Sequence, residues 1–290
     1  MTSSDYSLWI IPRGDGKNYA ALESFSIHLQ QAFAEIGHRV PIVRRLCEMR
    51  GRPLVLGPHR ILEHPKFFVP ANAILINTEH CSDQPSDLQR RFVDLLQHFE
   101  VWDFSPRNIS ILNRMGVKGV KFLELGATGN SRVRGDRSKD IDVLFYGQIN
   151  DRRREVLSFL TAGGVRVTCL HSVFGKALRE AIARAVIVLN IHRIYPVSLE
   201  MLRMLDLLPY GQFVISEEGS DHVLEERFRD GIVFARRDTL AEVCKSYLGK
   251  PDECSRIGGL GQAAFESIRQ AEVLQGLLTE NRFDSAKPNR

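Results

Sequence analysis

The sequence of 290 residues lacks the features that mark several common protein classes. Its five cysteines are an odd number without C-x-x-C spacing, which argues against a disulfide framework and against a zinc site. No apolar run approaches the roughly 20 residues that span a bilayer. The first segment, MTSSDYSLWIIPRGDGK, has neither the basic region nor the long apolar region of a signal peptide. We therefore expect a cytoplasmic protein, whose membrane contact, if any, would be peripheral at the inner face.

Two common nucleotide-binding motifs are also missing. The pattern GxxxxGK[ST] of P-loop NTPases does not occur. The pattern GxGxxG of nicotinamide-dependent enzymes has no good match, because Gly14-x-Gly16 lacks the third glycine and Gly259-x-Gly261 does not follow a strand pattern. The net charge of +4 is small and the arginines are scattered. This argues against a nucleic-acid partner and suits an anionic small ligand or an anionic membrane surface.

Short apolar runs alternate with longer helical patterns, which predicts βα units with parallel sheets. The expected strands are 7–11, 40–43, 54–56, 73–77, 100–104, 120–123, 142–146, 165–170, 186–190 and 213–216. The expected helices are 18–36, 85–98, 106–115, 151–162, 176–185, 198–208, 240–248 and 255–269. The segment GATGNSRVRGDRSKD is polar and almost without apolar side chains, which is typical of a linker. We therefore expect domains at 1–125 and 140–275, a linker at 126–139 and a tail at 276–290.

Ligands of open α/β sheets bind beyond the carboxyl ends of the strands. The first such end in the second half is Gly147, which would let the backbone approach a ligand. It is followed by Asn150 and by Arg152 and Arg153, which lie in the first turn of a helix capped by Asp151. A helix N-terminus with arginines favours an anion. A capped surface helix with solvated arginines is the alternative.

The second strand end is the segment from Asn190 to Glu200. Ser198 is expected at the N-cap or first position of a helix, so the N–H groups of Ser198, Leu199 and Glu200 would form an anion cradle. The Glu200 carboxylate could accept hydrogen bonds from two vicinal hydroxyls, such as those of a ribose, or could compensate the helix dipole. His192, from its position alone, is expected to be bonded to backbone. The third strand end, SEEGSD at 216–221, could bind hydroxyls but is expected to be an acidic loop.

The order DVLFYG, a helix, then VIVLNIHRIYPVSLEMLRMLDLLPYGQFVISEEGSD is similar to the donor-binding half of GT-B glycosyltransferases, over roughly residues 140–270. The resemblance implies an α/β fold of two Rossmann-like domains facing a cleft, with the acceptor domain first. It assigns the nucleotide ribose to Glu200, backbone contacts with the phosphates to Ser198 and Leu199, and the diphosphate to a basic residue near the strand-end glycine. Where the family has a first glutamate, eight positions before Glu200, this chain has His192. This departure puts a retaining mechanism in doubt.

The resemblance implies transfer of a sugar from a nucleotide-diphosphate sugar to an acceptor that could be a saccharide, a lipid-linked glycan, a peptide or a small molecule. We expect no metal and no cofactor, because amides and arginines can stabilise the leaving diphosphate. His192 and Asp15, between glycines after the first strand, are the candidate catalytic residues, although an Asp-Gly turn also explains Asp15. Glu79 and His80 are expected to line the acceptor cleft. A nucleotide-sugar epimerase and a non-catalytic binding or scaffold protein of this fold remain alternatives.

Overall fold

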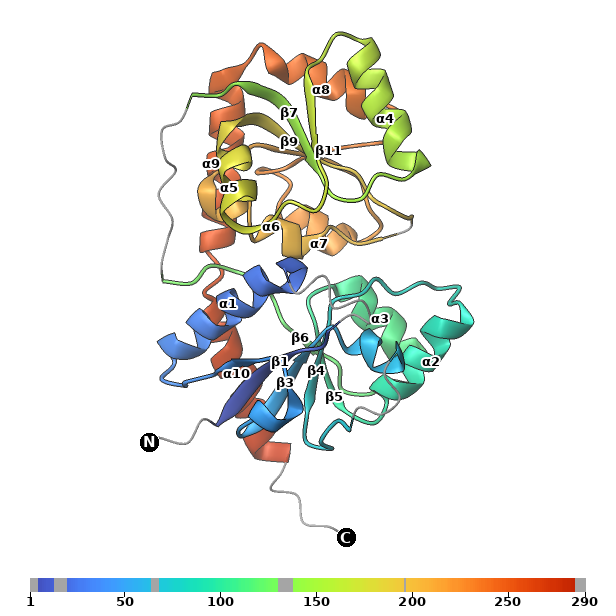
Figure 1. The fold of residues 1–290 in the computed structure, drawn as a ribbon, viewed down its shortest axis with the longest axis vertical. Helices are drawn as coiled ribbons and strands as arrows, with labels where there is room; N and C mark the ends of the chain where they lie inside the picture. The colour runs from blue at the N-terminus through green and yellow to red at the C-terminus, as the bar shows by residue number, and fades with distance from the viewer. Residues whose placement is uncertain (1–4, 13–19, 64–67, 130–137, 196, 285–290) are drawn as a thin grey trace. The chain divides into compact units, whose positions relative to one another are not determined.

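The computed structural model describes residues 5–12, 20–63, 68–129, 138–195 and 197–284. The chain divides into two compact units, Met1–Asn130 with Ile268–Arg290, and Ser131–Ser267. Each unit is built on one parallel sheet with helices packed on it (Figure 1). The expectation of two parallel α/β domains is therefore confirmed.

The first unit has a six-stranded sheet of order β2-β1-β3-β4-β5-β6. Its strands are β1 (Tyr6–Ile10), β2 (Ile42–Val43), β3 (Arg52–Leu56), β4 (Ile74–Asn77), β5 (Glu100–Asp103) and β6 (Lys121–Phe122). Its helices are α1 (Ala20–Glu35), α2 (Asp87–Leu96), α3 (Pro106–Arg114) and α10 (Gln270–Asp284), with 3-10 turns at Leu46–Glu48 and Pro58–Glu63. The central strands β3 and β4 are buried on both faces, as continuous apolar runs predict.

The second unit has a five-stranded sheet of order β11-β10-β9-β7-β8. Its strands are β7 (Ile141–Tyr146), β8 (Val167–Leu170), β9 (Ala185–Asn190), β10 (Val214–Glu217) and β11 (Val233–Ala235). Its helices are α4 (Asp151–Ala162), α5 (Gly175–Arg184), α6 (Met201–Met204), α7 (His222–Arg227), α8 (Leu240–Leu248) and α9 (Pro251–Glu266), with a 3-10 turn at Leu208–Tyr210. Because all strands are parallel, the carboxyl ends of β7, β9 and β10 meet at one edge of this sheet.

The end of the chain differs from the prediction. Helix α10 belongs to the first unit, where it packs against α1, so the boundary at 275 and the tail from 276 do not describe this region (Figure 1). The buried side chain of Gln270 explains the docking, because it accepts from the Gly126 N–H at 3.0 Å and donates to the Glu124 carbonyl at 3.1 Å. Residues 126–129 of the expected linker are therefore part of the first unit, and 130–137 lie outside the described residues.

The expected helix at 198–208 is the clearest error in the secondary structure. Only Met201–Met204 is helical. Beyond it, the N–H groups of Asp206 and Leu207 bond to carbonyls three residues back, and Pro209 supplies no N–H, so the α-helix cannot continue. Strand β11 and helix α7 were not predicted, and the expected helix at 255–269 ends at Glu266 before α10 begins.

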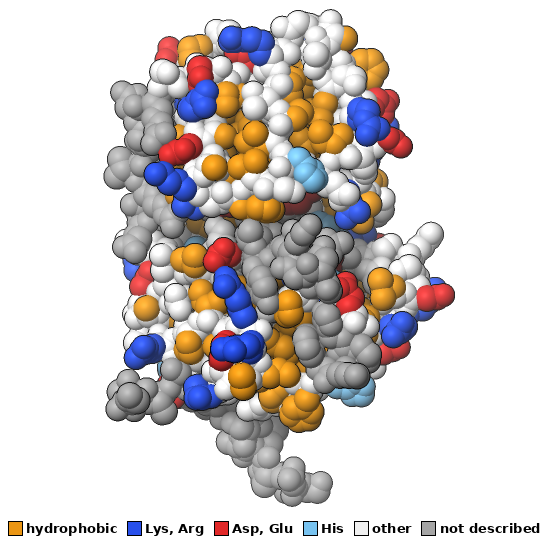
Figure 2. Space-filling model, viewed as in Figure 1, with side chains coloured by type: hydrophobic (Ala, Val, Ile, Leu, Met, Phe, Trp, Pro, Cys, Tyr) orange, Lys and Arg blue, Asp and Glu red, His pale blue; other side chains and the backbone are white. Residues whose placement is uncertain are grey.

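Surface charge and helix hydropathy bear on the expected partners. On the face shown in Figure 2, basic and acidic side chains are interspersed instead of forming one large basic area. Among the helices of the described residues, none combines the length and apolar character that a bilayer crossing requires.

Candidate functional site

Polar side chains gather at the carboxyl ends of β7, β9 and β10. Asn190 ends β9 and is fully buried, and its side-chain amide donates to the Glu200 carboxylate at 2.6 Å and to the Ser216 hydroxyl at 3.0 Å. The Nδ1 atom of His192 lies 3.0 Å from both carboxylate oxygens of Glu200. Glu200 is thus held from two sides by residues of the neighbouring strand end.

The Glu200 carboxylate keeps acceptor capacity and some contact with solvent. Its side chain is 19% exposed, whereas that of His192 is fully buried. A carboxylate offers about four acceptor positions, and the hydrogen bonds from Asn190 and His192 occupy two of them. Burial raises the pKa of Glu200, but the charges and hydrogen bonds of His192, Arg203 and Asn190 outweigh it and hold the pKa well below its usual range. Glu200 is therefore an ionised acceptor with about two positions left for a ligand.

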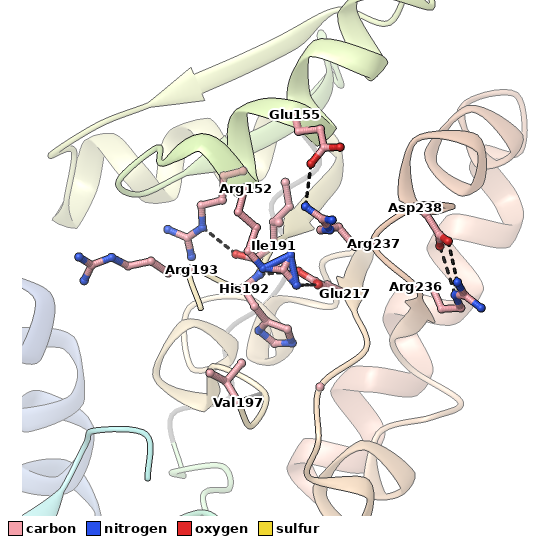
Figure 3. Close-up of polar contacts among 12 residues, drawn as sticks. Arg152, Glu155, Ile191, His192, Arg193, Val197, Glu217, Arg236, Arg237 and Asp238 are labelled. Carbon is pink, nitrogen blue, oxygen red and sulfur yellow. Dashed lines mark hydrogen bonds and ion pairs between the residues drawn. The ribbon is translucent and has the colours of Figure 1, made fainter. Parts of the chain in front are cut away.

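His192 is more deeply buried than the Glu200 carboxylate to which it is bonded. Its ring points toward Val197 (Figure 3), and its Nε2 atom, which is buried, has no hydrogen-bond partner among the described residues. Since the carboxylate can only accept, the Nδ1 atom of His192 must donate a hydrogen bond to it. The ring is bonded to Glu200 and not to backbone, and no atom of it reaches the surface. This geometry makes His192 a positioning residue for Glu200 and does not support the catalytic role given to it.

Arg152 and Arg153 have different surroundings. The Arg152 guanidinium forms an ion pair with Glu217, whose other carboxylate oxygen accepts from the His192 N–H at 3.0 Å (Figure 3). Arg153 is 5% exposed and donates to the carbonyls of Ile191 and Gln148 at 2.8 and 2.7 Å. The solvated-arginine alternative is therefore wrong for Arg153, and Arg152 is already neutralised by a carboxylate.

The loop after β7 is shaped by Gly147 and Asn150. Gly147 has a φ of 125°, which favours glycine. Asn150, and not the expected Asp151, caps α4 by accepting from the Arg153 N–H at 3.1 Å. The amide of Asn150 also donates to the Arg193 carbonyl at 2.8 Å, so it ties the loop after β7 to the loop after β9.

Ser198 and Leu199 precede α6 in a segment without regular secondary structure, and Glu200 is the N-cap of that helix. The Ser198 hydroxyl donates to Asp221 at 3.2 Å, and both Ser198 and Leu199 are fully buried. Ser198 and Leu199 are therefore not in the first turn of a helix, as the prediction of an anion cradle at a helix N-terminus required. Among the described residues, however, the backbone N–H groups of Leu199 and Glu200 make no hydrogen bond, so they keep donors for a ligand.

The predicted acidic loop after β10 is largely buried. Glu217 is 2% exposed and Asp221 is 1% exposed, and only Glu218 of this segment is an exposed carboxylate. Burial raises the pKa of Glu217, against the opposing charges of His192 and Arg152. The sequence signal for Glu217 was its place at the last position of an apolar strand, where a side chain still lies inside the fold.

The candidates in the first unit are less connected. Asp15 lies outside the described residues. Glu79 is half exposed and its carboxylate lies 3.2 Å from His59 Nδ1, while His80 is partly buried, and both follow β4. Asp103 is fully buried and accepts from the side-chain amides of Asn77 and Asn108 at 2.6 and 3.1 Å, so it fixes the loop after β4.

Among the residues that the structure describes, no three His, Cys, Asp or Glu side chains are grouped so that they could hold a metal ion.

Solved structures with the same fold cover almost the whole chain. HepE of Anabaena in complex with UDP-glucose matches 95% of this chain and 99% of its own, with a TM-score of 0.65 and 12% identity. Sucrose-phosphate synthase of Thermosynechococcus elongatus matches 97% and 100%, with a TM-score of 0.63 and 12% identity. WaaG, a glycosyltransferase involved in lipopolysaccharide biosynthesis, matches 94% and 98%, with a TM-score of 0.59 and 10% identity. The chain therefore has the GT-B fold of glycosyltransferases.

Sequence comparison adds little to this. No protein-family model matches the chain. An uncharacterized protein of Acanthamoeba polyphaga mimivirus is 25% identical over 183 residues, which are 61% of this chain. The match spans 59% of the length of that viral protein.

Proposed function

We propose that this protein is a glycosyltransferase that binds a nucleotide-diphosphate sugar at the carboxyl edge of the second sheet. The observation that carries the proposal is the state of Glu200: ionised, fixed by Asn190 and His192, partly exposed, and left with about two acceptor positions. Two vicinal hydroxyls of a ribose would fill those positions. The charged acceptor makes each such hydrogen bond one of the stronger kind.

The fold supports this assignment. The edge beyond parallel strands is where ligands of such sheets bind, and structures of the same fold include HepE with UDP-glucose and the enzymes sucrose-phosphate synthase and WaaG. These likenesses extend over at least 94% of this chain. We infer that a nucleotide sugar is the donor and that its acceptor, which nothing in the described residues identifies, binds elsewhere.

The phosphates would meet the unused N–H groups of Leu199 and Glu200 and the guanidinium of Arg153, next to Gly147. Preorganised N–H donors stabilise charge that develops on a leaving diphosphate. We therefore propose transfer without a metal, so that EDTA should not change donor binding. Asp15 as a base and Glu79 and His80 as acceptor contacts stay predictions.

A non-catalytic binder of nucleotide sugars is the second candidate. The specific observation in its favour is His192, which is buried and bonded to Glu200 at the position where the family pattern has a glutamate near the sugar. Such a protein would bind the donor normally and neither transfer nor hydrolyse it. An epimerase would instead interconvert the free donor without an acceptor.

The test is donor binding by calorimetry across nucleotide-diphosphate sugars of different bases. Glu200→Gln should weaken binding about tenfold or more, because a charged hydrogen bond contributes on the order of 1.5–3 kcal/mol. Glu218→Gln is the matched control, since Glu218 is an exposed carboxylate at the same strand end. Equal affinity of parent and Glu200→Gln for every donor would refute the ribose assignment. Transfer or hydrolysis of a bound donor then separates the enzyme from the binder.

A further inference from the structure

Arg203 was not among the predicted site residues, but the structure brings it to the donor edge. Helix α6 begins after Glu200, so Arg203 follows the N-cap by three residues and lies on the same side of the helix as Glu200. Its guanidinium donates to the carbonyl of Tyr146 at 3.0 Å and lies 4.3 Å from the centre of the Tyr146 ring. These two contacts fix Arg203 over the end of β7 and leave most of its N–H donors unused.

A second guanidinium converges on the same point. A Cβ atom built on Gly147 would lie 3.4 Å from Arg203 Nη2 and 3.7 Å from Arg153 Nη1. The two arginines come from different helices, since Arg203 lies on α6 and Arg153 on α4. The missing side chain of Gly147 thus leaves a small space that two cations border.

Neither cation forms a close ion pair with a described residue, although the charge of Glu200 acts on both of them. In the described part of the chain, no carboxylate oxygen lies within 4.0 Å of the guanidinium of Arg153 or of Arg203. Burial and the nearby charge of Arg203 lower the pKa of Arg153 to about 10, against the opposing charges of Glu200 and Glu217. Two like charges held together in a partly buried place are costly unless an anion lies between them.

The position relative to Glu200 indicates which anion fits. Glu200 is bonded to Asn190 at the end of β9, and the two guanidinium groups lie at the end of β7, the neighbouring strand. Neighbouring strands are about 4.8 Å apart. A ribose on Glu200 would place its first phosphate near the free N–H groups of Leu199 and Glu200, and a second phosphate one strand further, at Gly147.

We propose that Arg203 binds the distal phosphate of the nucleotide and makes the site select a diphosphate over a monophosphate. This inference rests on the proposed function and adds a residue and a selectivity to it. Arg152, which the sequence favours for this role, is occupied by Glu217. Arg203 supplies the cation in its place, from a helix that the sequence does not connect with phosphate binding.

The experiment compares UDP with UMP, and in parallel the same pairs of adenine and guanine nucleotides, by calorimetry. Arg203→Gln should weaken diphosphate binding about 10- to 100-fold and leave monophosphate binding within about twofold. Arg203→Lys keeps the charge but loses the planar fork, so it should recover only part of the affinity. The control is Arg237→Gln, which removes a cation at the same sheet edge that is already paired with Glu155 at 2.7 Å.

The possible results separate the two proposals. Loss confined to the diphosphate in Arg203→Gln, with an unchanged Arg237→Gln, supports the inference. Equal losses for diphosphate and monophosphate would mean that Arg203 only supports Tyr146 and the fold, and the inference is then wrong. Unchanged binding of both would also overturn it. If the parent binds none of the nucleotides, the proposed function fails first and the inference fails with it.

Discussion

Replacing Arg152 by methionine tests whether the donor edge contains a buried ion pair. Arg152 pairs with Glu217, and the exposed fractions of the two side chains are 20% and 3%. Methionine keeps much of the length and apolar volume of the arginine stem but removes the charge. The Glu217 carboxylate would then remain buried, and within the described part of the chain its one close partner would be the His192 N–H.

The expected cost follows from that isolation. Breaking a buried ion pair by removing one partner costs about 3–5 kcal/mol, and the partial exposure of Arg152 places this case near the lower end. Burial already raises the pKa of Glu217, and loss of Arg152 raises it further. The folded variant then holds a proton on Glu217 up to a higher pH than the unfolded chain does, in which the pKa of Glu is about 4.3. Stability is therefore lost as pH rises, so the destabilisation should be largest at pH 7 and should shrink toward pH 5.

The two units allow an internal control in the assay. Both tryptophans of the chain, Trp9 and Trp102, lie in the sheet of the first unit and are almost completely buried. Tryptophan fluorescence during urea unfolding therefore follows the first unit, whereas far-UV circular dichroism follows both. Arg152→Met should shift the part of the dichroism transition that fluorescence does not report. The double variant Arg152→Met/Glu217→Gln should recover most of the loss, since it removes the unpaired charge.

Three results would refute this reasoning. A loss below about 1 kcal/mol at pH 7 would mean that the pair behaves as a surface salt bridge. An equal loss at pH 5 and pH 7 would exclude protonation of Glu217 as the link. A shift of the fluorescence transition as large as that of the dichroism transition would place the effect in the wrong unit.

Two further predictions concern the neighbours of Glu200. His192→Ala should weaken donor binding about tenfold in the parent and hardly at all in the Glu200→Gln background, because His192 acts through Glu200. Calorimetry on the two single variants and the double variant measures this, and additive losses of affinity would contradict it. Gly219→Ala should destabilise the second unit by about 1–3 kcal/mol, because the added Cβ would lie 2.5 Å from the Val197 carbonyl oxygen. Urea unfolding followed by circular dichroism should show the change, while the transition followed by tryptophan fluorescence should not move. An unaltered dichroism transition would show that the segment shifts without cost.

The sheets could be predicted because their strands are continuous apolar runs with well-marked ends. Val143, Leu144 and Phe145 are fully buried on alternating faces of β7, and the same holds for the centre of β9. A strand covered on both faces needs no alternation, so the run itself is the signal. Strand β11 was missed although Ile232–Ala235 is an apolar run, because the run is short and two of the three strand residues are only partly buried.

The error at residues 198–208 has a different origin. The apolar spacing of this segment is helical, but Val197 and Ser198 are held by the loop after β10: the Ser220 N–H donates to the Val197 carbonyl at 2.8 Å, and Ser198 bonds to Asp221. These contacts join residues 23 positions apart. Local periodicity cannot report them, because tertiary contacts override helix propensity.

In the candidate site, too, the sequence indicated the positions of the strand ends but not the contacts between distant side chains. The sequence placed Gly147, Asn150, Arg153 and Glu200 at the correct sheet edge, because a strand end is marked by where its apolar run stops. It did not reveal which arginine is neutralised. Glu217 lies 65 residues after Arg152 in the sequence. Their strand ends come together only because β7 pairs with β9 and β9 pairs with β10.

The order of charges along the edge follows from that pairing. Glu217 forms an ion pair with Arg152, and Glu200 accepts hydrogen bonds from His192 and Asn190, so both carboxylates have partners without a ligand. Among the described residues, no carboxylate lies within ion-pair distance of Arg153 or Arg203. The edge therefore presents one ionised acceptor next to two unpaired cations, an arrangement that matches a molecule with hydroxyls at one end and phosphates at the other. A variant that frees Arg152 by removing Glu217 would add a third cation, and the preference for more highly charged nucleotides should then increase.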